Sequence, residues 1–193
     1  ATSGPGATNL ITGIATAYMD SIPMVALTGQ VATKLIGKDA FQEVDITGAT
    51  LPFTKHSYLI KDGLDIPRVV NEAFHIANTG RPGPVLIDFP MDLLKKEFDY
   101  PDEDEDVNIR GYKLMGKANE SQVKKVAEAI KGAKKPVILA GGGVVISDAT
   151  NEFRKFVKET DIPVVSTMMG IGILPSDNPR YYGMIGSHGV KRA

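Results

Sequence analysis

The most constraining feature of this sequence is an alternation of short, mostly apolar runs with longer stretches whose apolar residues recur at helical spacing. The apolar runs are residues 23–28, 84–89 and 136–140, and each is followed directly by Gly or Pro. Runs of this length and composition are typical of strands buried in a parallel sheet. Strands and helices in this order indicate βαβ units, so we predict an α/β fold with parallel sheets.

The helical periodicity predicts four helices, and weaker apolar runs predict two further strands. In the second helix we expect one apolar face, formed by Val69, Val70, Ala73, Phe74 and Ala77. Ligands of parallel sheets bind beyond the carboxyl ends of the strands, which makes residues 28–30 and 88–91 candidate ligand edges. The predicted helices are residues 9–20, 65–78, 121–133 and 148–160, and the further strands are 56–60 and 161–166. Residues 3–8 are predicted loop, and residues 30–50 are predicted loop with a short helix.

An acidic stretch divides the chain into two parts. Clustered like charges repel one another and stay hydrated, so we interpret this stretch as a solvated linker in preference to a metal or cationic-partner site. We expect domains at residues 1–96 and 119–193, joined by an acidic linker at 97–118. Because the chain begins inside a Gly-rich motif without Met, we expect a piece of a longer protein with two incomplete domains. The seven acids are Glu97, Asp99, Asp102, Glu103, Asp104, Glu105 and Asp106.

Composition excludes several classes of function. The 193 residues include 22 Lys and Arg against 23 Asp and Glu, a net charge of −1, which gives no basic footprint for nucleic acid. Apolar stretches are interrupted well before the roughly 20 residues that a membrane span needs. Without Cys there is no disulfide, thiolate nucleophile or Cys-based metal site, and the three His residues lack metal-ligand spacing. We therefore predict no metal ligand in this chain.

Three motifs could bind a ligand. Residues 3–9 are a Gly-rich loop before a helix, and residues 141–143 are three Gly residues after a strand; both resemble phosphate-binding turns but lack the third glycine of the dinucleotide fingerprint. Either could equally be a structural turn. Residues 39–43 combine charges, an aromatic ring and an amide, which could line a pocket or begin an amphipathic helix capped by Asp39.

Together the motifs resemble one family. Residues 2–9 (TSGPGATN), 28–31 (TGQV), 39–43 (DAFQE), 80–85 (GRPGPV), 141–143 (GGG) and 183–189 (GMIGSHG) occur in the order found in catalytic subunits of acetolactate synthase, which are thiamine-diphosphate enzymes. The resemblance covers the whole chain, and DAFQE with GRPGPV is its most specific part. It implies a pyrimidine-binding domain followed by a central Rossmann-like, FAD-binding domain, both cut short here.

The resemblance implies a reaction and its participants. Two 2-keto acids, pyruvate with pyruvate or 2-ketobutyrate, condense with decarboxylation in branched-chain amino-acid biosynthesis, with thiamine diphosphate, FAD and Mg²⁺ as cofactors. It also implies a cytoplasmic homo-oligomer, a dimer or tetramer, with a possible regulatory subunit. Phe41 and Gln42 match the substrate-facing wall of the active site and are the implied catalytic residues. The implied cofactor-binding residues are Pro5, Asn9, Ser21, Gln42, Arg81, Gly141, Gly142, Gly143, Thr167, Met168, Met169, Ile185, Gly186, His188 and Gly189.

The sequence departs from the family pattern at two positions. Met91 stands where a lysine usually follows the Asp-x-Pro, and Lys38 stands where Thr is common. The family's catalytic glutamate and its Mg²⁺-binding segment have no counterpart here, so we expect this chain alone to be inactive. Two alternatives stay open: another thiamine-diphosphate enzyme (glyoxylate carboligase, pyruvate oxidase or a 2-keto acid decarboxylase), or a non-catalytic nucleotide-binding module.

Overall fold

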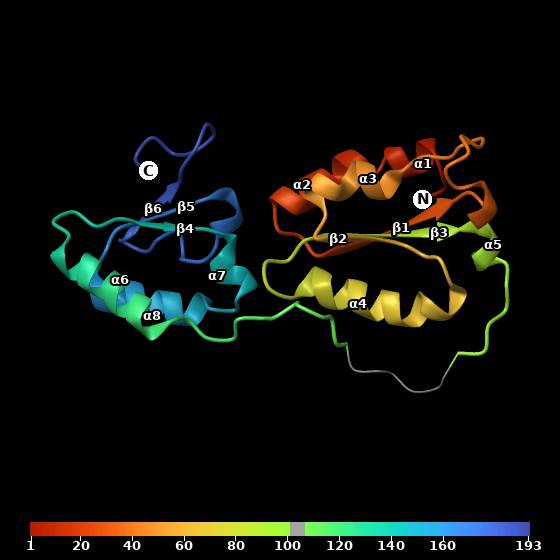
Figure 1. The fold of residues 1–193 in the computed structure, drawn as a ribbon. Helices are drawn as coiled ribbons and strands as arrows, with labels where there is room; N and C mark the ends of the chain where they lie inside the picture. The colour runs from red at the N-terminus through yellow and green to blue at the C-terminus, as the bar shows by residue number, and fades with distance from the viewer. Residues whose placement is uncertain (101–106) are drawn as a thin grey trace. The chain divides into compact units, whose positions relative to one another are not determined.

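A computed structural model describes residues 1–100 and 107–193 (Figure 1). The chain forms two compact units, unit 1 (residues 1–116) and unit 2 (residues 117–193). Phe98, Ile109 and Tyr112, which lie in the predicted linker, pack against the core of unit 1. Asp102, Glu103, Asp104, Glu105 and Asp106 lie outside the described residues. The predicted bounds of the domains and the linker stay predictions.

Unit 1 contains a three-stranded parallel sheet in the order β1–β3–β2, which confirms the predicted α/β class. The strands are β1 (Met24–Gln30), β2 (His56–Leu59) and β3 (Pro84–Pro90). All seven residues of the central strand β3 are buried, as its continuous apolar run predicted. Thr28 of β1 and Leu59 of β2 both pair with Asp88, so the carboxyl ends of the three strands meet at one edge.

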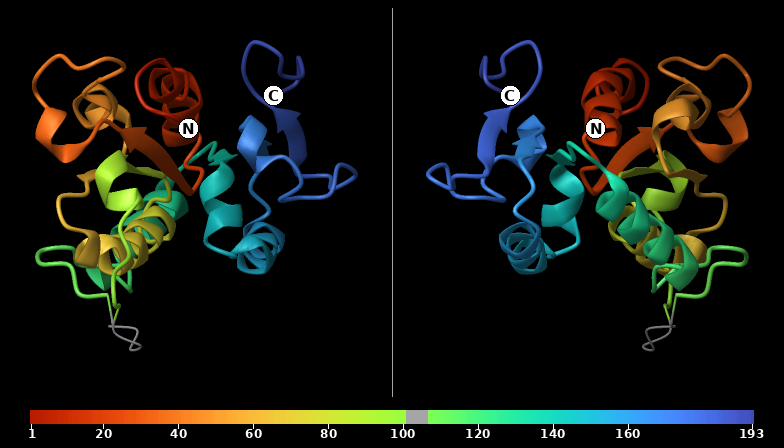
Figure 2. Two further views of the ribbon diagram at one scale, coloured as in Figure 1. Left: turned by 90° about the vertical axis from the view of Figure 1, so that its right-hand side faces the viewer. Right: turned by 90° about the vertical axis from the view of Figure 1, so that its left-hand side faces the viewer.

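Helices cover both faces of this sheet (Figure 1). On one face lie α1 (Pro5–Thr8), α2 (Ile11–Met19) and α3 (Ile46–Thr50), and on the other lies α4 (Ile66–Asn78). The turned views show the same separation (Figure 2). Alternation along β3 explains the two cores, because Leu86 packs with Ile14 and Ile46, whereas Ile87 packs with α4. Short elements complete the unit: α5 (Met91–Leu94) and the 3₁₀ turns Thr33–Leu35, Leu51–Phe53 and Gly63–Asp65.

Two details of unit 1 differ from the sequence prediction. The predicted loop at residues 3–8 contains α1, whose first position is Pro5, a residue whose fixed φ suits a helix start. Phe74 is 55% exposed and does not belong to the apolar face of α4. The buried face is formed by Val69, Ala73, Ile76 and Ala77, and Phe74, one position after Ala73, is rotated by about 100° away from it.

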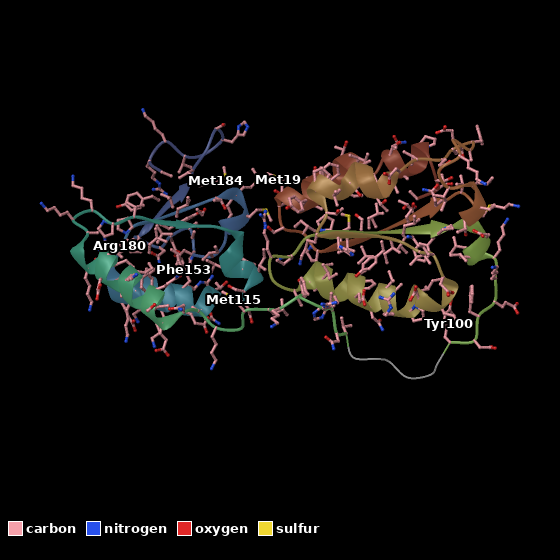
Figure 3. The ribbon with its side chains drawn as sticks, viewed as in Figure 1. Met19, Tyr100, Met115, Phe153, Arg180 and Met184 are labelled. Carbon is pink, nitrogen blue, oxygen red and sulfur yellow. The ribbon has the colours of Figure 1, made fainter. Side chains whose placement is uncertain are left out.

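Unit 2 also contains a three-stranded parallel sheet, in the order β4–β5–β6. The strands are β4 (Ile138–Ala140), β5 (Val164–Ser166) and β6 (Tyr181–Met184). The helices are α6 (Glu120–Gly132), α7 (Gly142–Ile146) and α8 (Thr150–Thr160), with a 3₁₀ turn at Met168–Gly170. Phe153 of α8 packs against a core of Ala140, Val157, Val164, Ile173 and Leu174 (Figure 3).

The sequence predicted α6, α8, β4 and β5 but neither α7 nor β6. Both missed elements are short and contain glycine, so neither offers a long periodic pattern. Two apolar residues of α6 are exposed in unit 2: Val123 and Val126 each keep more than half of their surface exposed.

Candidate functional site

Two predicted site segments meet at the carboxyl edge of the unit 1 sheet. We call this place the unit 1 edge and define it by Gly4, Pro5, Asn9, Phe41 and Gln42. Gly4 adopts φ +60°, and a Cβ added there would lie 2.7 Å from the Gln42 carbonyl oxygen and 2.9 Å from its Cα. Only glycine fits this approach, because it permits positive φ and has no side chain. The Gly-rich loop and residues 39–43 are therefore in direct contact.

Backbone pairing carries the Gly-rich loop to this edge. The nitrogen of Ala1 donates to the Leu27 carbonyl oxygen at 2.7 Å, and the Gly29 N–H donates to the Ala1 oxygen at 2.9 Å. Residues that bond in this way on either side of Thr28 pair with β1 in parallel. Ser3 and Gly4 consequently lie beside the carboxyl end of β1. The Ser3 nitrogen is 3.5 Å from the position that a Cβ on Gly29 would take, which is an ordinary contact distance.

Residues 37–43 form a turn that one carboxylate holds together. Glu43 accepts hydrogen bonds from the backbone N–H groups of Gly37 and Ala40. These bonds favour the ionised form and hold the pKa of Glu43 below its usual range. Asp39 has φ +54° and begins no helix, so the interpretation of Asp39 as a helix cap is wrong; the next helix, α3, is capped by Asp45.

The side chains of Phe41 and Gln42 project from this turn into solvent. Phe41 is 89% exposed, and Gln42 is exposed with φ +59°. The described residues of unit 1 therefore do not enclose these two side chains in the apolar pocket that the resemblance implies. Their catalytic role stays a prediction, as do the cofactor roles of Pro5 and Asn9, which lie exposed at the two ends of α1.

A buried carboxylate lies directly beneath the unit 1 edge. Asp88 of β3 is 1% exposed and accepts hydrogen bonds from Thr28 Oγ1 at 2.6 Å and Gln30 Nε2 at 2.8 Å. Burial raises its pKa although both hydrogen bonds oppose the rise, and the charge of Asp45 adds to it. Residues 88–91 were predicted as a ligand edge, but no separate role was predicted for Asp88. Its signal in the sequence is a carboxylate inside an otherwise apolar strand.

Ser21 and Arg81 lie at the opposite, amino-terminal edge of the same sheet. Arg81 Nε donates to Ser21 Oγ at 2.8 Å, and its Nη2 donates to the Met19 carbonyl oxygen at 3.1 Å. The guanidinium also lies 5.8 Å from the centre of the Tyr18 ring. A strand of seven residues spans about 23 Å, so these two residues cannot contact the same small group as Gln42 within one unit. Arg81 borders a cleft of about 480 Å³ that is also lined by Lys55, Thr79 and Tyr112.

In unit 2 the predicted segments come together at the carboxyl edge of the β4–β5–β6 sheet, which we call the unit 2 edge. Residues 141–143 follow β4, residues 167–169 follow β5, and residues 185–189 follow β6. The Thr167 N–H donates to the Ala140 oxygen at 2.9 Å, and the Ile185 N–H donates to the Ser166 oxygen at 2.9 Å.

Close contacts explain two of the glycines at the unit 2 edge, Gly142 and Gly189. A Cβ on Gly142 would lie 2.9 Å from the Met169 Cβ, and one on Gly189 would lie 2.4 Å from the Met184 oxygen. Met168, Met169 and His188 are exposed there, so the edge presents open backbone together with polarizable side chains. Gly143 also borders a mostly apolar cleft of about 420 Å³ that is lined by Val144, Phe153 and Phe156, which the sequence did not predict.

The described ranges, 1–100 and 107–193, contain no cluster of three or more His, Cys, Asp or Glu side chains able to hold a metal ion. Among the helices of these ranges, none has the length and apolar character needed to cross a membrane.

Comparisons with known proteins give the family. Residues 1–49 match the N-terminal TPP binding domain of thiamine pyrophosphate enzymes, and residues 123–193 match their central domain. All of this chain aligns with a probable acetolactate synthase large subunit of Methanocaldococcus jannaschii at 53% identity, covering 33% of that protein. It aligns with the acetolactate synthase large subunit of Buchnera aphidicola subsp. Schizaphis graminum at 49% identity, covering 34% of that protein. It aligns with the acetolactate synthase of Mycobacterium leprae at 50% identity, covering 31% of that protein. The chain thus spans about a third of the length of these relatives. It belongs to the thiamine pyrophosphate enzyme family.

Proposed function

We propose that this chain functions as part of an acetolactate synthase large subunit. The observation that carries the proposal is the alignment of the whole chain with proteins of that name at 53% and 49% sequence identity. The proposed reaction condenses pyruvate with a second pyruvate or with 2-ketobutyrate and releases carbon dioxide. The geometry supports it, because Gly4 and Gln42, which belong to the motifs of the resemblance, are in contact at a ligand-binding edge of the sheet.

The unit 1 edge suits the aminopyrimidine ring of thiamine diphosphate. A neutral planar ring needs amide partners and apolar surface, and Asn9, Gln42, Pro5 and Phe41 supply both. When bound, the cofactor supplies the electron sink for decarboxylation. In this proposal Phe41 keeps water from the reacting carbon, and the Gln42 amide donates a hydrogen bond to an oxygen of the keto acid.

FAD is proposed as a second cofactor. The three loops of the unit 2 edge offer bare backbone at Gly141, Gly142 and Gly143 and soft packing from Met168 and Met169. The family resemblance assigns flavin contact to Arg81, whose forked guanidinium suits a phosphate or a ring edge. Mg²⁺ is proposed for the whole enzyme, and we assign none of the described residues to it.

The exposure of Phe41 supports a homo-oligomer. A large aromatic side chain that is 89% exposed at a site requiring exclusion of water needs a covering surface, which a second subunit could supply. We therefore propose a dimer or tetramer, with a possible regulatory subunit, acting in the cytoplasm.

Product analysis of the full-length protein tests the proposed function. With pyruvate, thiamine diphosphate, Mg²⁺ and FAD we expect acetolactate, and with added 2-ketobutyrate we expect acetohydroxybutyrate. Acetaldehyde or acetyl phosphate as the main product would identify a different enzyme of the family. We expect no turnover from residues 1–193 alone, and acetolactate formed by them would contradict the proposed need for further parts.

Three variants of the full-length protein test the unit 1 edge. Gly4→Ala must displace the Gln42 backbone, and Gln42→Ala removes the amide, so we expect kcat/KM for pyruvate to fall by about 100-fold in each. Gly13→Ala is the matched control, since a Cβ there meets nothing within 4 Å inside α2. It should keep full activity and raise stability by about 0.5–1 kcal/mol. Unchanged activity of Gln42→Ala would remove the catalytic assignment.

A further inference from the structure

The side chain of Gln30 makes three hydrogen bonds at the junction of three segments. Gln30 is buried at the end of β1. Its Nε2 donates to Asp88 Oδ2 and to the Val44 carbonyl oxygen, each at 2.8 Å, and its Oε1 accepts from the Val31 N–H at 2.9 Å. One amide therefore joins β1, the buried carboxylate of β3 and the chain just after the Phe41–Gln42 turn.

This junction continues to the unit 1 edge. Val44 lies two residues after Gln42, whose backbone in turn contacts Gly4. The Glu43 carboxylate closes the turn on itself through Gly37 and Ala40 but makes no bond to the sheet among the described contacts. Among the described contacts, the Gln30 amide thus supplies the hydrogen bond that joins this turn to the strand ends. Val44 also packs on the core around Ile14 and Leu86.

We propose that Gln30 is a positioning residue, which together with Asp88 fixes residues 37–44 to the sheet and so holds Gln42 against the Gly-rich loop. The effect on catalysis rests on the proposed function, whereas the effect on the turn does not. An apolar side chain of similar volume would fill the space, yet it would leave Asp88 Oδ2 and the Val44 oxygen without this donor. The turn would then open more readily, and Gln42 would spend less time in its working position.

The test compares Gln30→Met with Thr54→Val in the full-length protein. Thr54 is the matched control because it is also buried in unit 1 and its hydroxyl joins the Thr50 carbonyl oxygen at 3.0 Å and Ser57 Oγ at 3.0 Å, away from the turn. Both variants lose buried hydrogen bonds and should lose thermal stability to a similar degree. Only Gln30→Met should accelerate amide hydrogen exchange in residues 37–43, by about tenfold or more.

Kinetics supply a second readout. For Gln30→Met we expect KM for pyruvate to rise by about tenfold, with a smaller change in kcat, and for Thr54→Val we expect neither to change. Unchanged exchange in residues 37–43 of Gln30→Met would overturn the positioning role, whatever the activity. A wild-type protein that makes no acetolactate would instead refute the proposed function, and the exchange measurement would still decide this inference. If Gln30→Met does not fold, Gln30→Asn, which is one methylene too short to reach both acceptors, replaces it.

Discussion

At the scale of single residues, two carboxylates near the end of β3 have opposite environments. Asp88 is buried, and burial raises its pKa. Asp92 lies four residues later in α5, where the Thr33 N–H and hydroxyl each donate to it at 2.8 Å and lower its pKa. An Asp carboxyl has a pKa of about 3.9 in the unfolded chain. Asp88 is therefore easier to protonate in the folded protein than in the unfolded chain, and Asp92 is harder to protonate.

This difference predicts opposite pH dependences of stability for two matched variants. The stability contributed by Asp88 is complete below its unfolded pKa and is lost as pH rises through its raised folded pKa. Wild type should accordingly lose stability relative to Asp88→Asn as pH rises from about 4 to 7. Urea unfolding of both proteins across this range measures the difference.

Asp92→Asn supplies the comparison of opposite sign. The contribution of Asp92 is present above its unfolded pKa and is lost as pH falls through its lowered folded pKa. The stability of the wild type should therefore rise relative to that of Asp92→Asn as pH rises through the acidic range. If both variants changed in the same direction, the environment assigned to Asp88 would be incorrect.

At the scale of elements, Lys55 secures the carboxyl end of α4. Its ammonium donates to the carbonyl oxygens of Ile76 and Thr79, and Tyr112 donates to the Thr79 oxygen at 3.2 Å. A cation at the negative end of the helix dipole stabilises the helix and satisfies carbonyls that lack partners within it. This arrangement also holds Gly80 and Arg81, which follow directly, at the mouth of the cleft at the amino-terminal edge.

Removing that ammonium should cost stability. For Lys55→Met, which keeps an apolar stem of similar length, we expect the free energy of unfolding to fall by about 1–2 kcal/mol. Lys61→Met is the control, because Lys61 is exposed and outside this cluster. Urea unfolding would show the difference, and equal effects of the two substitutions would mean that Lys55 does not cap α4.

How far the sequence predicted the fold depended on the length and burial of each element. The strand at residues 84–89 was predicted because every residue of β3 is buried and all except Asp88 are apolar. The strand β6 was missed because its strand geometry comes from pairing with β5, and a four-residue segment containing Gly183 has little preference of its own. The exposure of Phe74 shows the same limit, since packing against β3 selects which face of α4 is buried.

The candidate site was predictable in its parts but not in its arrangement. Motif resemblance selected Pro5, Gln42 and Arg81, and the order of strands and loops implied that some would share a sheet edge. It could not show that Gln42 contacts Gly4 while Arg81 lies at the other end of the strands, because such contacts depend on pairing between distant segments. The bonds of Gln30 were hidden for the same reason, since Asp88 and Val44 are far from it in the sequence.

At the scale of the whole molecule, each unit has its own sheet and its own core. In unit 1, Leu86 of β3 is fully buried against Ile14 of α2 and Ile46 of α3. In unit 2, Ile173 is 2% exposed and belongs to the core. Units that bury separate cores can unfold separately, and each then responds only to damage in its own core. The chain should therefore show two unfolding transitions that single substitutions shift one at a time.

Leu86→Ala and Ile173→Ala test this independence as reciprocal controls. Each leaves a cavity and should destabilise its own unit by about 2–5 kcal/mol. Hydrogen exchange of the 193-residue chain in increasing urea would separate the two effects, because amides of β3 report on unit 1 and amides of β5 report on unit 2. We expect Leu86→Ala to accelerate exchange in β3 alone and Ile173→Ala to accelerate it in β5 alone. Acceleration of both strands by either substitution would show that the two units unfold as one cooperative body.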